Sequence, residues 1–159
     1  MKVKLLNDGF YRDLQNIKFP KTVEALQLNG TTRVFVKSSE FGIDSDETFM
    51  FIDGEYEVIN KYTELSDFEI NKKVAEHLGD SGNWFELSDF DPCNNPADAM
   101  PIIIENNISL RAPTITDRWK AEFIDEYGNY VGYRRALNKN PLRACMELYL
   151  MIKDAENEG

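Results

Sequence analysis

The chain has 159 residues, of which 42% are hydrophobic and 12% aromatic, so it can bury a core and is not a disordered tail. Its formal net charge of −10 disfavours direct binding to DNA or RNA, which needs clustered Lys and Arg, and suits docking onto a basic partner. No apolar run is long enough to span a membrane and no signal-peptide pattern is present, so we expect a cytoplasmic protein. Two cysteines in a reducing compartment and a single histidine predict neither a disulfide nor a metal site, and we expect no cofactor.

Residues 1–60 have the pattern of a small β-rich domain. Asn29-Gly30 and Asp53-Gly54 each separate two runs in which polar and apolar residues alternate, and such dipeptides tolerate positive φ. This arrangement predicts two β-hairpins among about five strands, which we expect to form a small barrel or a rolled sheet.

Residues 61–159 predict a second domain that opens with a helix over 67–78. Ser66 and Glu69 have the spacing of a capping box, in which each side chain accepts a hydrogen bond from the backbone N–H of the other residue. Phe68 belongs to the apolar stripe that we expect this helix to bury.

Two further helices begin with the same pair of residues, an asparagine followed by a proline. Asn95 and Asn140 are the predicted N-caps. Pro96 and Pro141 occupy the first helical position, where the missing N–H has no cost. We expect the last helix to end near Ala155.

Between these two helices the chain has the pattern of a short antiparallel sheet. Residues 108–111 are a candidate strand, and 117–124 alternate polar and apolar residues before a turn leads into 130–134. The whole chain is therefore predicted to be α+β: the β-rich domain is followed by an α/β sandwich in which three helices lie on a short antiparallel sheet.

Three blocks of the second domain carry a resemblance to a known family. They read LSDFEINKKVA at 65–75, CNNPADAMPII at 93–103 and NPLRAC at 140–145. From residue 62 to 155 the chain resembles the NinX-type family of tailed phages and prophages of enteric bacteria, and residues 1–59 resemble, less specifically, a small β-rich phage module. The resemblance implies a phage-encoded accessory protein with an α/β sandwich fold. It implies no known activity and no catalytic residues.

Cys93 is the candidate nucleophile of an enzymatic alternative, because a helix N-terminus lowers the pKa of a thiol. Such a nucleophile needs a base, and His77 is the one histidine in the chain. A cluster of carboxylates is the second candidate for hydrolysis or ligand binding, although its spacing matches no calcium loop. We favour structural roles for Cys93 and His77 and a solvated surface for the carboxylates. The cluster consists of Asp80, Glu86, Asp89, Asp91 and Asp98.

No phosphate-binding loop, dinucleotide-binding motif or serine-hydrolase elbow occurs, so we expect a protein that is not an enzyme and has no catalytic residues. We expect it to bind and modulate or inhibit a host protein, such as a defence or nucleic-acid-handling factor. An alternative is a nucleic-acid mimic, in which the carboxylates at 40–47 and 80–91 imitate phosphates. The sequence leaves the oligomeric state open. The candidate partner-binding residues are Trp84, Asp89, Asp91, Asp44, Asp46, Glu47, Tyr127 and Tyr130.

Overall fold

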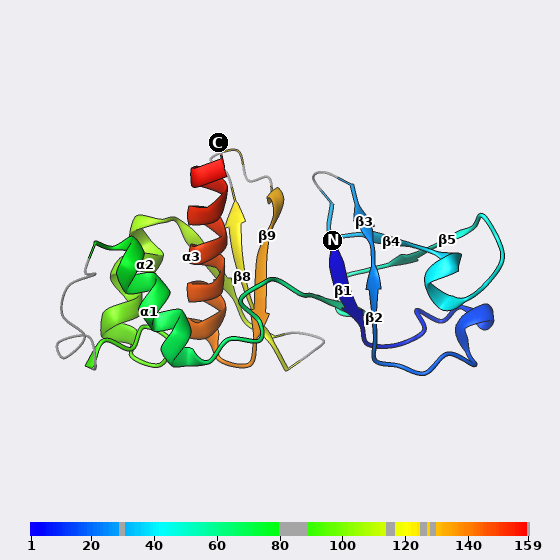
Figure 1. The fold of residues 1–159 in the computed structure, drawn as a ribbon, viewed down its shortest axis with the longest axis horizontal. Coiled ribbons are helices and arrows are strands. Elements are labelled where there is room, and N and C mark those ends of the chain that lie inside the picture. Colours follow the sequence, from blue (N-terminus) through cyan, green and yellow to red (C-terminus); the bar gives the residue numbers. More distant parts are fainter. Residues whose placement is uncertain (29–30, 80–88, 114–116, 125–126, 128–129, 159) are drawn as a thin grey trace. The chain divides into compact units, whose positions relative to one another are not determined.

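The computed structural model of the chain shows a mixed α/β protein with three α-helices and three small antiparallel sheets among the described residues (Figure 1). The chain falls into two compact units, Met1–Asn60 and Lys61–Gly159. The mixed helix and strand content confirms the predicted class. The structure describes residues 1–28, 31–79, 89–113, 117–124, 127 and 130–158, with backbone alone at 124 and 130–134.

The first unit contains two three-stranded antiparallel sheets and, among its described residues, no closed barrel. In one sheet β1 lies between β2 and β6, and in the other β4 lies between β3 and β5. The alternating run that precedes Asn29-Gly30 divides at Ala25, so that its first part pairs with β1 and its second part with β4. The strands are β1 (Lys2–Leu5), β2 (Lys21–Glu24), β3 (Leu26–Gln27), β4 (Val34–Lys37), β5 (Thr48–Phe51) and β6 (Tyr56–Val58).

One of the two predicted hairpins is wrong. Strands β5 and β6 flank Asp53-Gly54 as expected, but they belong to different sheets. Strand β6 pairs with β1, where Leu5 is opposite Tyr56, and the Tyr56 side chain is buried to 1% exposure. The pairing of β3 with β4 confirms the first hairpin, whose turn at Asn29-Gly30 lies outside the described residues.

The core of the first unit is rich in aromatic rings. Tyr11 packs edge-on against Phe49 and Phe51, with ring centroids 5.0 and 6.0 Å apart. The Tyr11 hydroxyl donates to the Met50 carbonyl (3.0 Å) and accepts from the Met50 N–H (3.1 Å), which fixes the ring against β5. Edge-to-face ring pairs of this kind add to the stability gained from burial alone.

The second unit is built around the last helix. Helix α3 (Pro141–Glu158) lies against a sheet of β7 (Ile108–Arg111), β8 (Trp119–Ile124) and β9 (Tyr130–Asn138), with β8 in the centre. Helices α1 (Asp67–His77) and α2 (Pro96–Glu105) pack against α3 (Figure 1).

Small side chains line the contact between α3 and the sheet. Ala121 of β8 and Ala136 of β9 are opposite each other and fully buried in one core with Ala144 and Leu148 of α3. Residues without bulky side chains let the helix backbone approach the sheet closely, and tight packing of this kind leaves few voids.

The predicted helix caps are present. In α1 the Ser66 hydroxyl accepts from the Glu69 N–H (3.2 Å), and the Glu69 carboxylate accepts from the Ser66 N–H (2.8 Å). In α2 the Asn95 side chain accepts from the Ala97 N–H (3.0 Å), directly before Pro96. The capping pattern of the sequence therefore predicts where these helices begin.

Two details of the helices differ from expectation. Helix α3 continues to Glu158, three residues beyond Ala155, and Lys153 and Glu156 pair across its last turns (2.9 Å). Phe68 is not part of the buried stripe of α1, because its side chain is 68% exposed while Ile70 and Val74 fill the inner face.

Candidate functional site

The three sequence blocks meet where the helices of the second unit begin. Asn140 caps α3 by accepting from the Leu142 and Arg143 N–H groups (3.0 and 3.3 Å), and its amide donates to the Cys93 carbonyl before α2 (2.7 Å). The Asn94 amide donates to Asp67 at the start of α1 (3.2 Å). Polar side chains thus join the three helix starts in one hydrogen-bonded network.

Arg143 connects α3 to the segment that enters α1. Its side chain is 6% exposed, and Nη1 pairs with the Asp67 carboxylate at 2.6 Å. Nη2 donates to the carbonyls of Tyr62 (3.0 Å) and Leu65 (2.7 Å). A guanidinium presents several donors in a fixed plane, so this one side chain holds the 61–65 segment in a defined place.

Asp91 serves this network and is not a free surface carboxylate. It accepts hydrogen bonds from the side-chain amides of Asn71 (2.7 Å) and Asn94 (3.1 Å to each oxygen). The Asn71 oxygen in turn accepts from the Cys93 N–H (3.1 Å). Asp98 accepts from the Asp91 N–H (2.9 Å). These contacts give two members of the predicted carboxylate cluster structural roles.

The surroundings of Cys93 oppose a role as a nucleophile. Its side chain has no exposed surface, and burial, followed by the nearby Asp67 carboxylate, raises the pKa of the thiol to about 12. A thiol with such a pKa is almost wholly protonated at neutral pH, and the thiolate is the reactive form. Cys145 is buried as well, and its pKa is raised to about 12.

A buried carboxyl lies beside Arg143. Glu147 is 1% exposed, its Oε1 lies 3.7 Å from Arg143 Nη2, and neither that oxygen nor Arg143 Nε makes a hydrogen bond within the described part of the chain. Burial raises the pKa of the Glu147 carboxyl to about 7, although the Arg143 charge opposes this. The protonation of Glu147 therefore changes near neutral pH.

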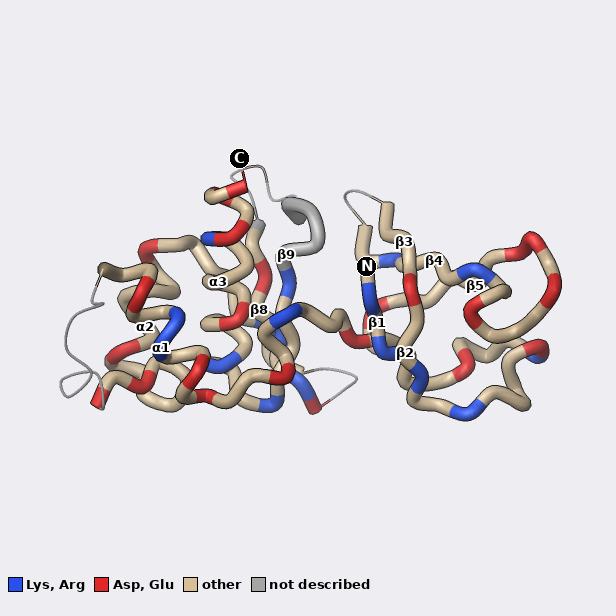
Figure 2. Tube along the Cα trace, viewed as in Figure 1, with Lys and Arg blue, Asp and Glu red and all other residues tan. Residues whose placement is uncertain are grey.

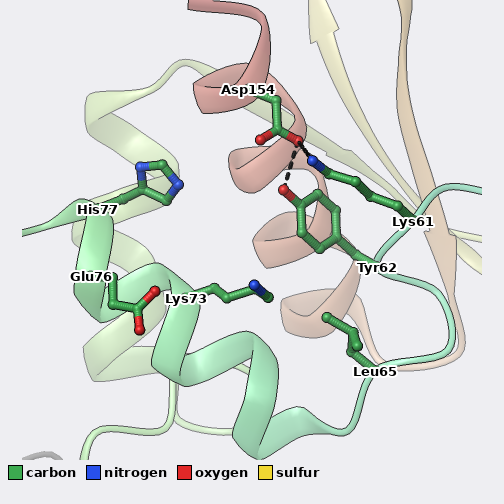
Figure 3. Close-up of a pocket in the computed structure, with 7 residues that line it drawn as sticks. All are labelled: Lys61, Tyr62, Leu65, Lys73, Glu76, His77 and Asp154. Atoms are coloured by element: carbon green, nitrogen blue, oxygen red, sulfur yellow. Dashed lines mark hydrogen bonds and ion pairs between the residues drawn. The ribbon is translucent and has the colours of Figure 1, made fainter. Parts of the chain in front are cut away.

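The second unit also contains an open cavity of about 340 Å³ (Figure 3). It lies between the 61–65 segment, the last turns of α1 and the end of α3. It contains the one histidine of the chain. The lining residues are Lys61, Tyr62 and Leu65 from the segment, Lys73, Glu76 and His77 from α1, and Asp154 from α3.

The carboxylate of Asp154 already has partners within this cavity. The Tyr62 hydroxyl donates to its Oδ2 at 2.6 Å, and Lys61 Nζ lies 2.8 Å from the same oxygen. Burial opposes the ionised form, but the hydrogen bonds from Lys61 and Tyr62 lower the pKa of Asp154 overall. Burial and then Asp154 raise the pKa of Tyr62 to about 12, so the phenol keeps its proton.

Lys73 and His77 differ from Lys61 because neither is hydrogen-bonded or ion-paired to a carboxylate among the described residues, although Lys73 acts electrostatically on Glu69 and His77 on Asp154. Figure 3 shows the Lys73 side chain extending from α1 toward Tyr62 and Leu65, and its Nζ forms no ion pair or hydrogen bond with the described residues. The His77 ring meets the Tyr149 ring edge-on, with centroids 6.3 Å apart. Sequence reasoning missed Lys61 and Lys73, because lysines are usually exposed and solvated. The sequence feature that could have indicated this pair is the four-residue spacing of Lys73 and His77, which places both on one helix face.

The predicted partner-binding residues are distributed over both units. Asp44, Asp46 and Glu47 are exposed in the segment before β5. Figure 2 shows acidic positions, drawn in red, in the loop that leads into β5. Asp89 is exposed, and the Tyr127 side chain is 80% exposed. Trp84, Asp80 and Glu86 lie outside the described residues, and so does the side chain of Tyr130.

Helix α2 presents an apolar face to solvent. Met100 is 44% and Ile104 is 68% exposed, and four residues separate them, so they lie one turn apart on the same face. Ala97 and Pro101 are exposed on that face as well. The opposite face, with Ile102 and Ile103, is buried.

Comparison with known proteins identifies a family for the second unit. A family model described as Bacteriophage P22, NinX matches residues 61–153, which is more than half of the chain and includes all three sequence blocks. No curated protein and no solved structure matches the chain. Within the described ranges no helix has the length and apolar character needed to cross a membrane, and no group of three or more His, Cys, Asp or Glu side chains is placed to hold a metal ion.

Proposed function

Because the chain belongs to the bacteriophage P22 NinX family, we propose that it is a phage accessory protein that acts by binding a host protein and altering that protein's action. The proposal assigns no chemical step to the chain. The partner is expected to contact the exposed apolar face of α2.

The observation that carries this proposal is the exposure of Met100 and Ile104 on an ordered helix. A helix that is apolar on all sides is usually buried on all sides, yet one face of α2 lies in solvent. Fully burying a Met or Ile side chain contributes about 1.5–3 kcal/mol. Met100 is 44% and Ile104 is 68% exposed, so covering both with a partner would contribute roughly half of that amount for each residue.

The charges of the sequence segment that contains α2 indicate the chemistry of the partner. Between Lys73 and Arg111 the sequence has seven Asp and Glu residues and no Lys or Arg. Of these acids, Glu76, Asp89 and Glu105 are exposed. Complementary charge speeds association and selects partners, so the proposed partner carries an apolar patch flanked by Lys and Arg.

Affinity capture from a lysate of the phage's host tests the proposal. The Met100→Ser and Ile104→Ser variants should each lose a stoichiometric host protein that the unchanged chain retains. Leu28→Ser is the matched control, because Leu28 is 59% exposed in the other unit. The proposal fails if no stoichiometric partner is captured, or if all three variants capture it equally.

Nucleic-acid mimicry is a second candidate, favoured by the exposed carboxylates of Asp44, Asp46 and Glu47. It requires that the captured host protein bind DNA or RNA at the surface that it offers to this chain. Adding duplex DNA or RNA to the captured complex should then release the host protein. Neutralising the segment as Asp44→Asn, Asp46→Asn and Glu47→Gln should weaken capture, whereas retention in both experiments would exclude mimicry.

A further inference from the structure

We propose that the cavity between the 61–65 segment, α1 and α3 binds a small ligand by one anionic group, a phosphate monoester or a carboxylate, which Lys73 and His77 hold. The inference does not depend on the proposed partner binding, because it uses none of the exposed apolar residues of α2.

The distribution of charge favours an anion over a cation. Two carboxylates line the cavity, but Asp154 already accepts from the Tyr62 hydroxyl and pairs with Lys61. Glu76 is exposed at the rim. A cation entering the cavity would meet the ammonium groups of Lys61 and Lys73. An anion would meet the Lys73 ammonium group, which interacts electrostatically with Glu69 but is in no ion pair or hydrogen bond with the residues that the structure describes.

Lys73 and His77 are placed to act together on one anionic group. They are four residues apart on α1, so both side chains leave the same face of the helix, and both line the cavity (Figure 3). An ammonium group and an imidazole supply N–H donors to phosphate or carboxylate oxygens, and hydrogen bonds involving an ionised group are stronger than neutral ones. The Tyr62 hydroxyl is committed to Asp154 at 2.6 Å and fixes the opposite wall.

The size and walls of the cavity indicate a ligand larger than an inorganic ion. A volume of about 340 Å³ lies in the range of small-molecule sites. The ring of Tyr62 and the side chain of Leu65 provide apolar wall beside the polar groups. A ligand with one anionic group on a small apolar or aromatic body matches this combination.

Proton NMR of the imidazole tests the site directly, because His77 is the one histidine in the chain. The full chain is titrated with phenyl phosphate, with benzoate and with uncharged benzyl alcohol, at constant ionic strength. We expect a saturable shift of the His77 ring signals with phenyl phosphate or benzoate and none with benzyl alcohol. The two anions separate phosphate from carboxylate as the preferred group.

Neighbouring lysines provide a matched pair of variants. Lys73→Gln removes the ammonium group in the cavity, and Lys72→Gln removes the same charge from the adjacent residue, which does not line it. A hydrogen bond to a charged group is worth about 1.5–3 kcal/mol, so Lys73→Gln should weaken binding by about tenfold or more and Lys72→Gln by less than about twofold. Thermal unfolding of both variants verifies that they remain folded.

Three results would overturn the inference: no saturable shift with either anion, equal binding of benzyl alcohol, or equal weakening by Lys72→Gln and Lys73→Gln. The last result would show that the anions respond to the overall charge of α1 and not to this cavity. If Lys73→Gln fails to fold, Lys73→Arg supplies the second measurement, because it keeps the charge and should retain saturable binding. Loss of binding in a folded Lys73→Arg chain would count against an electrostatic site.

Discussion

Replacing Glu147 with glutamine should stabilise the second unit above pH 7 and leave its stability near pH 4.5 unchanged. The Glu147 side chain is 1% exposed, and burial raises the pKa of its carboxyl from 4.5 to about 7. Between these values the unfolded chain loses the proton while the folded chain keeps it, so the free energy of unfolding falls as pH rises. Above pH 7 the loss is complete at about 3 kcal/mol, from 1.36 kcal/mol for each pH unit between the two pKa values.

The glutamine variant removes this cost because its amide has nearly the shape of the carboxyl and does not ionise. Arg143 is not left alone, since Nη1 keeps the 2.6 Å ion pair with Asp67 and Nη2 keeps both backbone carbonyls. Near pH 8 the variant should therefore exceed the unchanged chain by up to about 3 kcal/mol, with the difference disappearing as the pH falls toward 4.5.

Urea unfolding followed by tryptophan fluorescence measures this effect in the second unit, because both tryptophans, Trp84 and Trp119, belong to it. Curves are recorded at about pH 5 and about pH 8 for the unchanged chain and for Glu147→Gln. Glu64→Gln is the matched control, because Glu64 is exposed on the segment before α1. A gain for Glu147→Gln that is the same at both pH values, or an equal pH-dependent gain for Glu64→Gln, would refute the reasoning.

Three further outcomes follow from the network and the buried thiols. Asn140→Ala should lower the free energy of unfolding by about 2 kcal/mol in the same urea assay, because α3 loses its cap and the Cys93 carbonyl loses a 2.7 Å donor. Ser66→Ala should cost about 1 kcal/mol, since it removes one cap in a position open to solvent. An aromatic disulfide reagent at neutral pH should label neither Cys93 nor Cys145 until urea unfolds the chain, and rapid labelling of the folded chain would contradict the raised pKa of both thiols.

The local parts of the fold could be predicted from the sequence, because they depend on residues close together in the chain. Ser66 and Glu69 are three residues apart and form the capping box that their spacing predicts. Asn95 and Asn140 cap their helices by reaching N–H groups two or three residues away. Such contacts are determined by the backbone geometry of a helix start and need no knowledge of the rest of the fold.

Strand pairing in the first unit could not be predicted in the same way. Asp53-Gly54 turns the chain, but a turn does not require the strands on its two sides to pair. The choice depends on where Tyr56 can be buried, and β6 buries it by pairing with β1, which is about 50 residues earlier in the chain. Periodicity indicates which face of a strand is apolar and leaves its neighbour undetermined.

The cavity could not be predicted for a related reason. Its central interaction joins Tyr62 to Asp154, and 92 positions separate them. Each residue looks ordinary in its own segment: Asp154 lies in an acidic helix end, and Lys73 lies among the charged residues of an amphipathic helix. Their relation becomes visible only when α3 is packed against α1, which makes the site a property of tertiary structure.

The contrast between residues that fix helix starts and residues that line the cavity also explains why the family match predicts structure more directly than it predicts binding. The matching blocks contain the side chains that join the three helix starts, among them Asp67, Arg143 and Asn140. Of the nitrogen-bearing side chains in the cavity, Lys73 lies within a block, whereas Lys61 and His77 lie outside all three. A chain that kept the blocks but lacked His77 would retain the hydrogen bonds of the network and lose one of the two groups proposed to hold the anion.

His77→Leu should therefore unfold in urea much as the unchanged chain does. Its affinity for the better-binding anion, measured by calorimetry, should fall. An unchanged affinity would exclude the imidazole from the site.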